Sequence, residues 1–125
     1  MSKSEKITIN LNVVDLGKID LLVEQGFYSN RTDFIKTSIR NQLSSHANVV
    51  DQIITSKSYV IGVSHYDRKT LEKVLEENKI LDIKVVGMLS FSDDVDEELI
   101  IKTIKSVKVL GILKAPPEIK KALNF

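Results

Sequence analysis

Hydrophobic and polar residues alternate without a break near the start of the chain. Between Lys6 and Leu11 the apolar residues are Ile7, Ile9 and Leu11, with polar residues between them. This period of two predicts a β-strand with one buried side and one solvent-facing side. Because no second strand is predicted in this half, the backbone groups of the strand need a partner from outside it. The same strand of a second copy, paired antiparallel about a two-fold axis, is the simplest partner.

Two helices are predicted next, because apolar residues recur at helical spacing. The first covers about residues 15–25 and ends at Gly26, which suits a left-handed position after a helix. The second begins after Ser29 or Asn30, and both are good N-cap residues. Polar residues then cluster over residues 44–58, while part of this stretch keeps helical spacing. A continuous helix and a short separate helix are both compatible with that pattern.

The second half of the chain repeats a short pattern of two apolar residues, a glycine and a third apolar residue. Its three copies occupy residues 60–63, 85–88 and 109–112. A helix is predicted after each copy, and the three helices are expected to open at Asp67, Asp94 and Pro116-Pro117. Strands that are apolar on both sides and alternate with helices predict a parallel sheet in the order βαβαβα. The whole chain is therefore predicted to be α+β, with a small α/β domain after the N-terminal strand and helices.

The repeated glycines, Gly62, Gly87 and Gly111, lie inside predicted strands. A glycine weakens a strand, so its presence often marks a close approach to the backbone. Close packing of a helix or another subunit is the favoured explanation, and an effector pocket is the alternative. The small sheet also has two edges that association between copies can cover. This half is therefore predicted to join N-terminal dimers into a tetramer.

Composition and charge exclude several classes of protein. The chain has 125 residues, a net charge of +1, no cysteine and two separated histidines, His46 and His65. Disulfides and thiolate metal sites are therefore excluded, and we predict no metal. No apolar run is long enough to cross a membrane, and the first residues do not resemble a signal peptide, so we predict a cytoplasmic protein without a membrane partner. No catalytic motif is present, and we predict neither an enzyme nor a cofactor.

The polar side of the N-terminal strand is suited to reading DNA bases, because a two-stranded ribbon fits the major groove. Lys6 can donate to guanine, Thr8 can contact a thymine methyl group, and Asn10 can form two hydrogen bonds with adenine. A solvated surface strand is the alternative interpretation. The start of the second helix, with its unpaired N–H groups and Arg31, is suited to binding phosphate. Similar helix ends are also common in proteins that bind no phosphate.

Residues 4–46 resemble the ribbon-helix-helix family of DNA-binding proteins, the CopG, MetJ and Arc group. The resemblance rests on the basic, threonine-containing strand, the helix after it, and the motif GFYSNRTD over residues 26–33. It implies an intertwined dimer whose ribbon enters the major groove. Carried over by position, the base-reading residues are Lys6, Thr8 and Asn10, and the phosphate-binding residues are Ser29, Asn30 and Arg31. The implied dimer core consists of Ile7, Ile9, Leu11, Phe34, Ile35 and Ile39.

The resemblance implies a sequence-specific transcriptional regulator, in particular a repressor bound to a palindromic operator. Its partners would be double-stranded DNA and further copies of the chain, joined as a dimer through the N-terminal strand. We accordingly assign residues 1–46 to DNA binding, 47–57 to a linker or helix extension, and 58–125 to oligomerisation or sensing. The last of these is similar in architecture to the ligand-sensing domains of some repressors, including nickel-responsive ones. The sequence therefore leaves open whether a small-molecule effector binds this domain, although the clustered histidine and cysteine ligands of the nickel-responsive repressors are missing.

Two other functions are compatible with the sequence. The first is an antitoxin-type protein-interaction module that regulates its own operon. A folded βαβαβα domain argues against it, because the usual antitoxin tail is disordered until it binds. The second is an accessory DNA-binding protein of a plasmid or another mobile element, which would bind DNA without regulating transcription.

Overall fold

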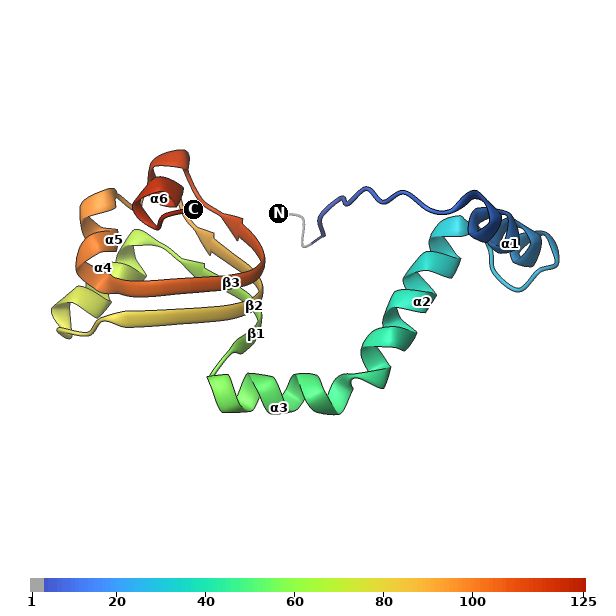
Figure 1. Ribbon diagram of the computed structural model, residues 1–125. Helices are drawn as coiled ribbons and strands as arrows, with labels where there is room; N and C mark the ends of the chain where they lie inside the picture. Colours follow the sequence, from blue (N-terminus) through green and yellow to red (C-terminus); the bar gives the residue numbers. More distant parts are fainter. Residues whose placement is uncertain (1–3) are drawn as a thin grey trace. The chain divides into compact units, whose positions relative to one another are not determined.

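The computed structural model describes residues 4–125, which form two compact units over residues 4–53 and 54–125 (Figure 1). Within this range there are six helices and three strands, so the fold is mixed α/β as predicted. They are α1 (Val13–Glu24), α2 (Arg31–Ser45), α3 (Ala47–Lys57), β1 (Val60–Tyr66), α4 (Arg68–Glu76), β2 (Leu81–Phe91), α5 (Glu97–Thr103), β3 (Ile104–Lys114) and α6 (Pro117–Ala122). In this part of the chain, every helix is too short or too polar to span a membrane.

The boundary between the two units falls inside α3, within the segment interpreted as a linker or helix extension. The predicted domain limits themselves stay a prediction, because a domain is defined by its capacity to fold alone. The first three residues of the predicted DNA-binding domain lie outside the described residues.

The N-terminal unit buries very little apolar surface in a single chain. Among residues 4–53, Ile19 is the one hydrophobic residue that is buried, at 7% exposure. Ile7 is 73% exposed, and Leu43 on α2 is also largely exposed. Burial on this scale cannot offset the conformational entropy lost in ordering fifty residues. Taken by itself, the unit therefore has too small a hydrophobic core to be stable.

The segment before α1, residues 4–12, forms neither helix nor strand in the single chain. An isolated strand has no partner for its backbone hydrogen bonds, so the predicted ribbon depends on a second copy and stays a prediction. Helix α1 begins at Val13, two residues earlier than predicted. The reason is local, because the Asn12 side chain accepts a hydrogen bond from the N–H of Val14 at 2.8 Å and so acts as the N-cap.

The end of α1 has the geometry predicted from its glycine. Gly26 adopts φ +88°, in the left-handed region that favours glycine. Its N–H donates to the carbonyl of Val23 at 3.1 Å, and the N–H of Phe27 donates to the carbonyl of Leu22 at 2.9 Å. These two bonds define a Schellman motif, which ends the helix and turns the chain towards α2.

The polar stretch after α2 contains a short separate helix, which decides between the two possibilities left open by the sequence. His46 leaves the helical conformation at the end of α2, and its N–H donates to the carbonyl of Leu43 at 3.1 Å. Ser45 Oγ donates to the carbonyl of Gln42 at 2.6 Å. Such side-chain bonds compete with the helical pattern and favour a break, after which α3 begins at Ala47.

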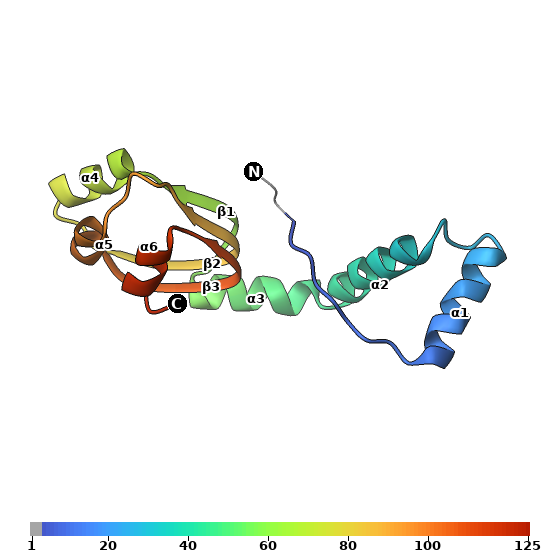
Figure 2. The same cartoon turned by 90° about the horizontal axis from the view of Figure 1, so that it is seen from above.

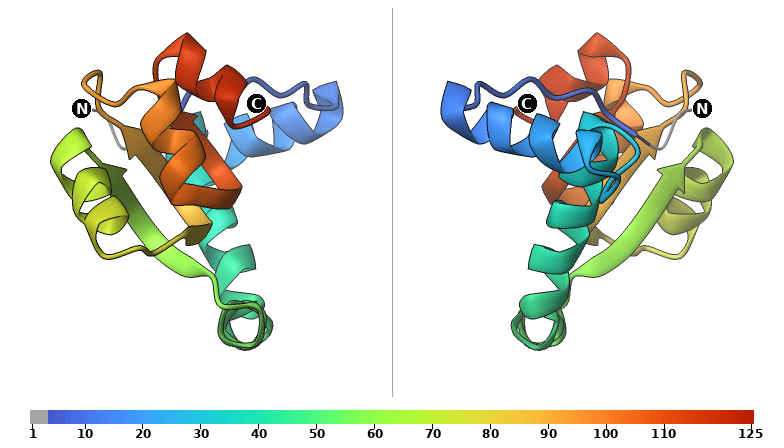
Figure 3. Two further views of the ribbon diagram at one scale, coloured as in Figure 1. Left: turned by 90° about the vertical axis from the view of Figure 1, so that its left-hand side faces the viewer. Right: turned by 90° about the vertical axis from the view of Figure 1, so that its right-hand side faces the viewer.

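The C-terminal unit confirms the predicted βαβαβα order. Strands β1, β2 and β3 lie side by side in that order and pair in parallel (Figure 2). Helices α4, α5 and α6 all lie on one face of the sheet (Figure 3). Between these layers is a continuous core, in which Leu71 of α4, Leu89 of β2 and Ile119 of α6 are fully buried. This unit therefore has the hydrophobic core that the N-terminal unit lacks.

The three strand glycines align across the sheet. Gly62 pairs with Gly87, and Gly87 pairs with Gly111. All three have positive φ, between +125° and +137°. A Cβ at Gly87 would press against the carbonyl oxygen of Gly62, and one at Gly111 against that of Gly87, far inside the 3.0 Å that real Cβ atoms keep. The close approach is thus to the neighbouring strand, and the favoured explanation, packing of a helix or subunit, is wrong for Gly87 and Gly111.

Two of the three helix starts in this half were predicted correctly, and the start of α5 was not. The Asp67 side chain caps α4 by accepting from the N–H of Thr70 at 2.8 Å, and Pro117 opens α6. Helix α5 is capped by Asp96, whose carboxylate accepts from the N–H of Leu99 at 2.8 Å, and not by Asp94. A contact distant in sequence explains the difference.

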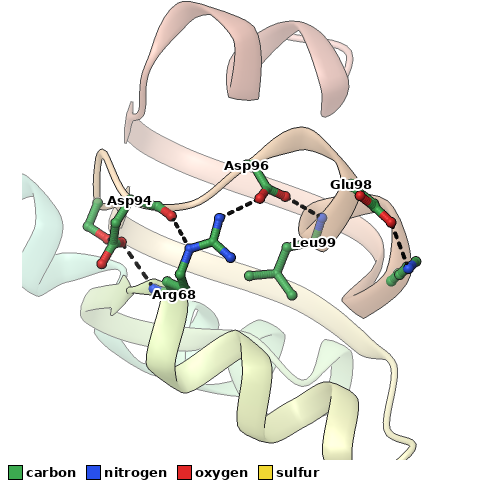
Figure 4. Close-up of polar contacts among 7 residues, drawn as sticks. Arg68, Asp94, Asp96, Glu98 and Leu99 are labelled. Carbon is green, nitrogen blue, oxygen red and sulfur yellow. Dashed lines mark hydrogen bonds and ion pairs between the residues drawn. The ribbon is translucent and has the colours of Figure 1, made fainter.

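That contact is made by Arg68 at the start of α4 (Figure 4). The Arg68 N–H donates to the Asp94 carboxylate at 3.1 Å, and its Nε donates to the Asp94 carbonyl at 2.6 Å. Arg68 Nη2 also forms an ion pair with Asp96. Ser92 Oγ donates to the same Asp94 carboxylate. Asp94 is thereby engaged in joining the loop before α5 to α4, which leaves Asp96 as the cap.

Candidate nucleic-acid interface

The predicted base-reading residues, Lys6, Thr8 and Asn10, are all exposed on the segment before α1. The apolar residues that alternate with them are exposed as well, so neither side of this segment is covered in a single chain. Chemistry distinguishes the two sides, because the apolar side gains free energy by leaving water and the polar side does not. The apolar side is therefore the one suited to contact another copy.

The start of α2 brings the predicted phosphate-binding residues together. Asn30 is the N-cap, and its side-chain oxygen accepts from the N–H of Asp33 at 2.8 Å. The Asp33 carboxylate accepts in turn from the N–H of Ser29 at 2.9 Å. The two bonds resemble a capping box, with the acidic side chain bonding one residue before the cap. This arrangement fixes the chain where it enters the helix and leaves the N–H groups of Arg31 and Thr32 without helical acceptors.

Arg31 is not an isolated cation. Its Nε donates to one carboxylate oxygen of Asp20 on α1 at 2.8 Å, and its Nη2 donates to the other at 2.8 Å. The hydrogen bond from Arg31 lowers the pKa of Asp20, and the same bond raises the pKa of Arg31. Both side chains are about half exposed. This two-point contact joins the start of α2 to the middle of α1.

The Asp20 contact changes what Arg31 can contribute to phosphate binding. Asp20 balances the charge of Arg31, so the pair adds no net attraction for a polyanion. A guanidinium group has five N–H donors, however, and two of them are used by Asp20. The others can still bind a phosphate oxygen, with the guanidinium held in place. Asp20 was not singled out from the sequence, because a partner eleven residues away on another helix carries no local signal.

The turn between α1 and α2 is held by an aromatic pair. The rings of Tyr28 and Phe34 are 5.0 Å apart between centroids and meet edge to face at 81°. Phe34 and Ile35, both predicted for the dimer core, are half-buried, whereas Ile39 is exposed. The residues predicted for the dimer core therefore keep exposed surface on both the segment before α1 and α2.

In the part of the chain that the structure describes, no three His, Asp or Glu side chains lie together where they could hold a metal ion. His65 at the end of β1 instead pairs with Ser90 on β2, with 2.8 Å between Nδ1 and Oγ. Two features of the described residues remain. The N-terminal unit has exposed apolar residues and a capped start of α2, and an α/β unit follows it.

These features fit a small DNA-binding unit with a separate α/β unit after it. The profile of the Ribbon-Helix-Helix transcriptional regulator family matches residues 2–120. Because the match spans nearly the whole chain, the protein belongs to this family. Proteins of the family bind DNA and typically form dimers. No curated protein and no solved structure matches the chain significantly.

Proposed function

We propose that the protein is a repressor that binds a palindromic operator as a dimer, with a ribbon of two N-terminal segments in the major groove. The observation that carries this proposal is the exposure of every apolar residue from Ile7 to Leu11, in a unit whose one buried hydrophobic residue is Ile19. Pairing two such segments buries both apolar sides together and satisfies both backbones. The polar sides then face outward, towards DNA.

The two groups of polar residues have different roles in this proposal. Lys6, Thr8 and Asn10 contact base edges and therefore supply sequence specificity. Ser29, Asn30 and Arg31, at the start of α2, contact phosphate and set the position of the ribbon on the duplex. With a net charge of +1, the chain has no strong general attraction for DNA, so specific contacts must supply much of the affinity.

Binding of single variants to operator DNA and to unrelated DNA tests this division. The operator is first located by footprinting the DNA upstream of the gene. Lys6→Ala, Thr8→Ala and Asn10→Ala should each weaken operator binding by about 1–3 kcal/mol and unrelated DNA by less. Lys18→Ala on α1 is the matched control, because it removes the same charge as Lys6→Ala outside the predicted ribbon. Equal losses on both DNAs in the three segment variants would contradict base reading.

The C-terminal unit is assigned to oligomerisation or sensing in this proposal. A tetramer joined through this unit would place two ribbons on two half-sites of one operator and so raise the apparent affinity. Its continuous core makes an autoregulating antitoxin the weaker candidate, since the interacting tail of that class is disordered before binding.

A further inference from the structure

The sheet of the C-terminal unit has a second face, over which no helix of residues 54–125 lies (Figure 3). On β2, Val85 and Leu89 belong to the core beneath the helices, so Val86 and Met88 point the other way. Strand register aligns six apolar residues on this side, which we call the open face. They are Ile61, Val86 and Leu110 in one row, and Val63, Met88 and Ile112 in the next.

The open face is apolar, and its residues on the two outer strands, β1 and β3, are substantially exposed. Ile61 is 60% exposed, and Val63 and Leu110 are each 49% exposed. Met88, on the central strand, is already buried by its neighbours at 4% exposure. A contiguous apolar surface of this kind on a soluble protein is typical of an interaction site, whereas single exposed apolar residues are not.

Polar residues border the open face at both ends of the strands. At the end near α3, the Nζ atoms of Lys84 and Lys108 lie 5.5 Å and 5.8 Å from the centroid of the Tyr59 ring. The Lys84 Nζ also donates to the carbonyl of Lys57 at 2.9 Å. At the other end is the contact between His65 and Ser90. An apolar centre with polar borders is the usual anatomy of a protein–protein interface.

The size of the open face limits what can cover it. The paired seven-residue stretch of the three strands, which includes the open face and its polar borders, has a footprint of about 300 Å² at usual strand spacing. A stable complex between two free proteins buries about 800 Å² on each partner, so one such face is too small to hold a free protein. Two dimers of this chain can meet through two faces at once. The second contact is then intramolecular, which multiplies the affinity of the first.

We propose that the open face packs against the open face of a second copy that belongs to another N-terminal dimer. Two dimers are thereby joined into a tetramer with apolar sheets face to face. The inference rests on the proposed function, because it requires the N-terminal dimer to supply two faces at a time. It assigns the tetramer contact to the sheet face, whereas the sequence had suggested the sheet edges and the glycine strip.

Sedimentation of the full chain tests the contact. We expect the wild-type protein to be a tetramer and Val63→Lys to be a dimer. The lysine would lose its hydration inside the apolar contact, which should weaken dimer–dimer association by about tenfold or more. Ile101→Lys is the matched control, because Ile101 is an apolar residue of α5 with 66% exposure that lies outside the open face. It should remain a tetramer.

A cysteine variant provides a second measurement with a milder substitution. The natural chain has no cysteine, so a short bismaleimide can link Val63→Cys only to another copy. We expect efficient crosslinking of Val63→Cys, little of Ile101→Cys, and loss of the crosslink when Leu110→Lys is added. A wild-type dimer at high concentration, or equal crosslinking at both positions, would overturn the face-to-face contact.

The DNA-binding measurement separates this inference from the proposed function. Val63→Lys should still bind a single half-site with wild-type affinity, because the substitution lies outside the N-terminal unit. Half-site binding by a protein that never forms tetramers would refute only the contact between open faces. A tetramer that binds no DNA would refute only the proposed function.

Discussion

At the scale of single residues, the pairing of Arg31 with Asp20 has the clearest consequence for DNA binding. Two charge-assisted hydrogen bonds hold the guanidinium on α1 and neutralise it. The position that the family resemblance assigns to phosphate is thus occupied by a cation whose charge is balanced. The strength with which Arg31 binds a phosphate therefore depends on its pairing with Asp20.

Removing the negative charge of Asp20 should therefore strengthen DNA binding in general. For Asp20→Asn we expect tighter binding to unrelated DNA, because Arg31 becomes available to a phosphate. The logarithm of the binding constant should also fall more steeply with the logarithm of the salt concentration, by about one released counterion. Fluorescence anisotropy over a series of salt concentrations measures both quantities. Asp15→Asn removes an equal charge from the first turn of α1 and serves as the control. The same change in both variants would mean that net charge alone matters.

Gly87 and Gly62 provide a second comparison at this scale. Both have positive φ, but an added Cβ meets a carbonyl oxygen only at Gly87, whereas the space at Gly62 is open. Gly62→Ala should cost about 1–3 kcal/mol of unfolding free energy through backbone strain alone. Gly87→Ala should cost about 1–3 kcal/mol more, because the strands must also move apart. Urea denaturation measures the difference, and equal costs would contradict the assigned contact.

At the scale of elements, the acidic loop before α5 is held by Arg68. The N–H of Leu99 and then the ion pair with Arg68 lower the pKa of Asp96. A carboxyl group with a lowered folded-state pKa stabilises the fold above its unfolded pKa, near 4. That contribution is lost as the pH falls through the folded pKa. The joint between α4 and α5 should therefore weaken in acid.

Two substitutions of Asp96 separate its functions as cap and as ion-pair partner. Asparagine is also a good N-cap, so Asp96→Asn should keep α5 but make stability less dependent on pH below 5. Asp96→Ala removes the cap as well and should lower the urea midpoint already at pH 7. Denaturation at pH 7 and pH 3.5, followed by circular dichroism, distinguishes them. An unchanged pH dependence in Asp96→Asn would exclude the ion pair as a source of acid sensitivity.

At the scale of the whole molecule, stability is divided unequally between the two units. The C-terminal unit has a continuous core, and the N-terminal unit has a single buried hydrophobic residue in one chain. We therefore expect the N-terminal unit to fold only as it dimerises. The dimer and the folded N-terminal unit should appear together as protein concentration rises.

A charge on the apolar side of the N-terminal segment should unfold the N-terminal unit and leave the C-terminal unit folded. For Ile9→Lys we expect loss of the N-terminal dimer and of the helical signal from α1 and α2, while the C-terminal unit stays folded. Circular dichroism and sedimentation report these changes. Thr8→Lys places the same charge on the polar side and should keep the N-terminal dimer and, with it, the assembly of the wild-type protein. An Ile9→Lys protein that keeps both the wild-type assembly and the helical signal would show that this side is not the interface.

The local features of this protein followed from the sequence by itself. The βαβαβα order, the glycine at the end of α1 and the cap Asp67 depend on residues within a few positions of each other, whereas the sequence left the cap of α2 open between Ser29 and Asn30. Periodicity and capping act over that range, so they can be read directly. The motif over residues 26–33 likewise indicated the family that the profile match later showed.

Only the tertiary structure decided the features that depend on partners distant along the chain. Asp96 caps α5 because Arg68 engages Asp94, and Arg31 is neutralised by Asp20 on another helix. The aligned glycines are needed because neighbouring strands approach each other's backbone at Gly87. Each of these contacts joins residues 11 to 28 positions apart, and many alternative pairings fit the same sequence. Packing selects one of them, which is why local patterns indicated the elements but not the contacts between them.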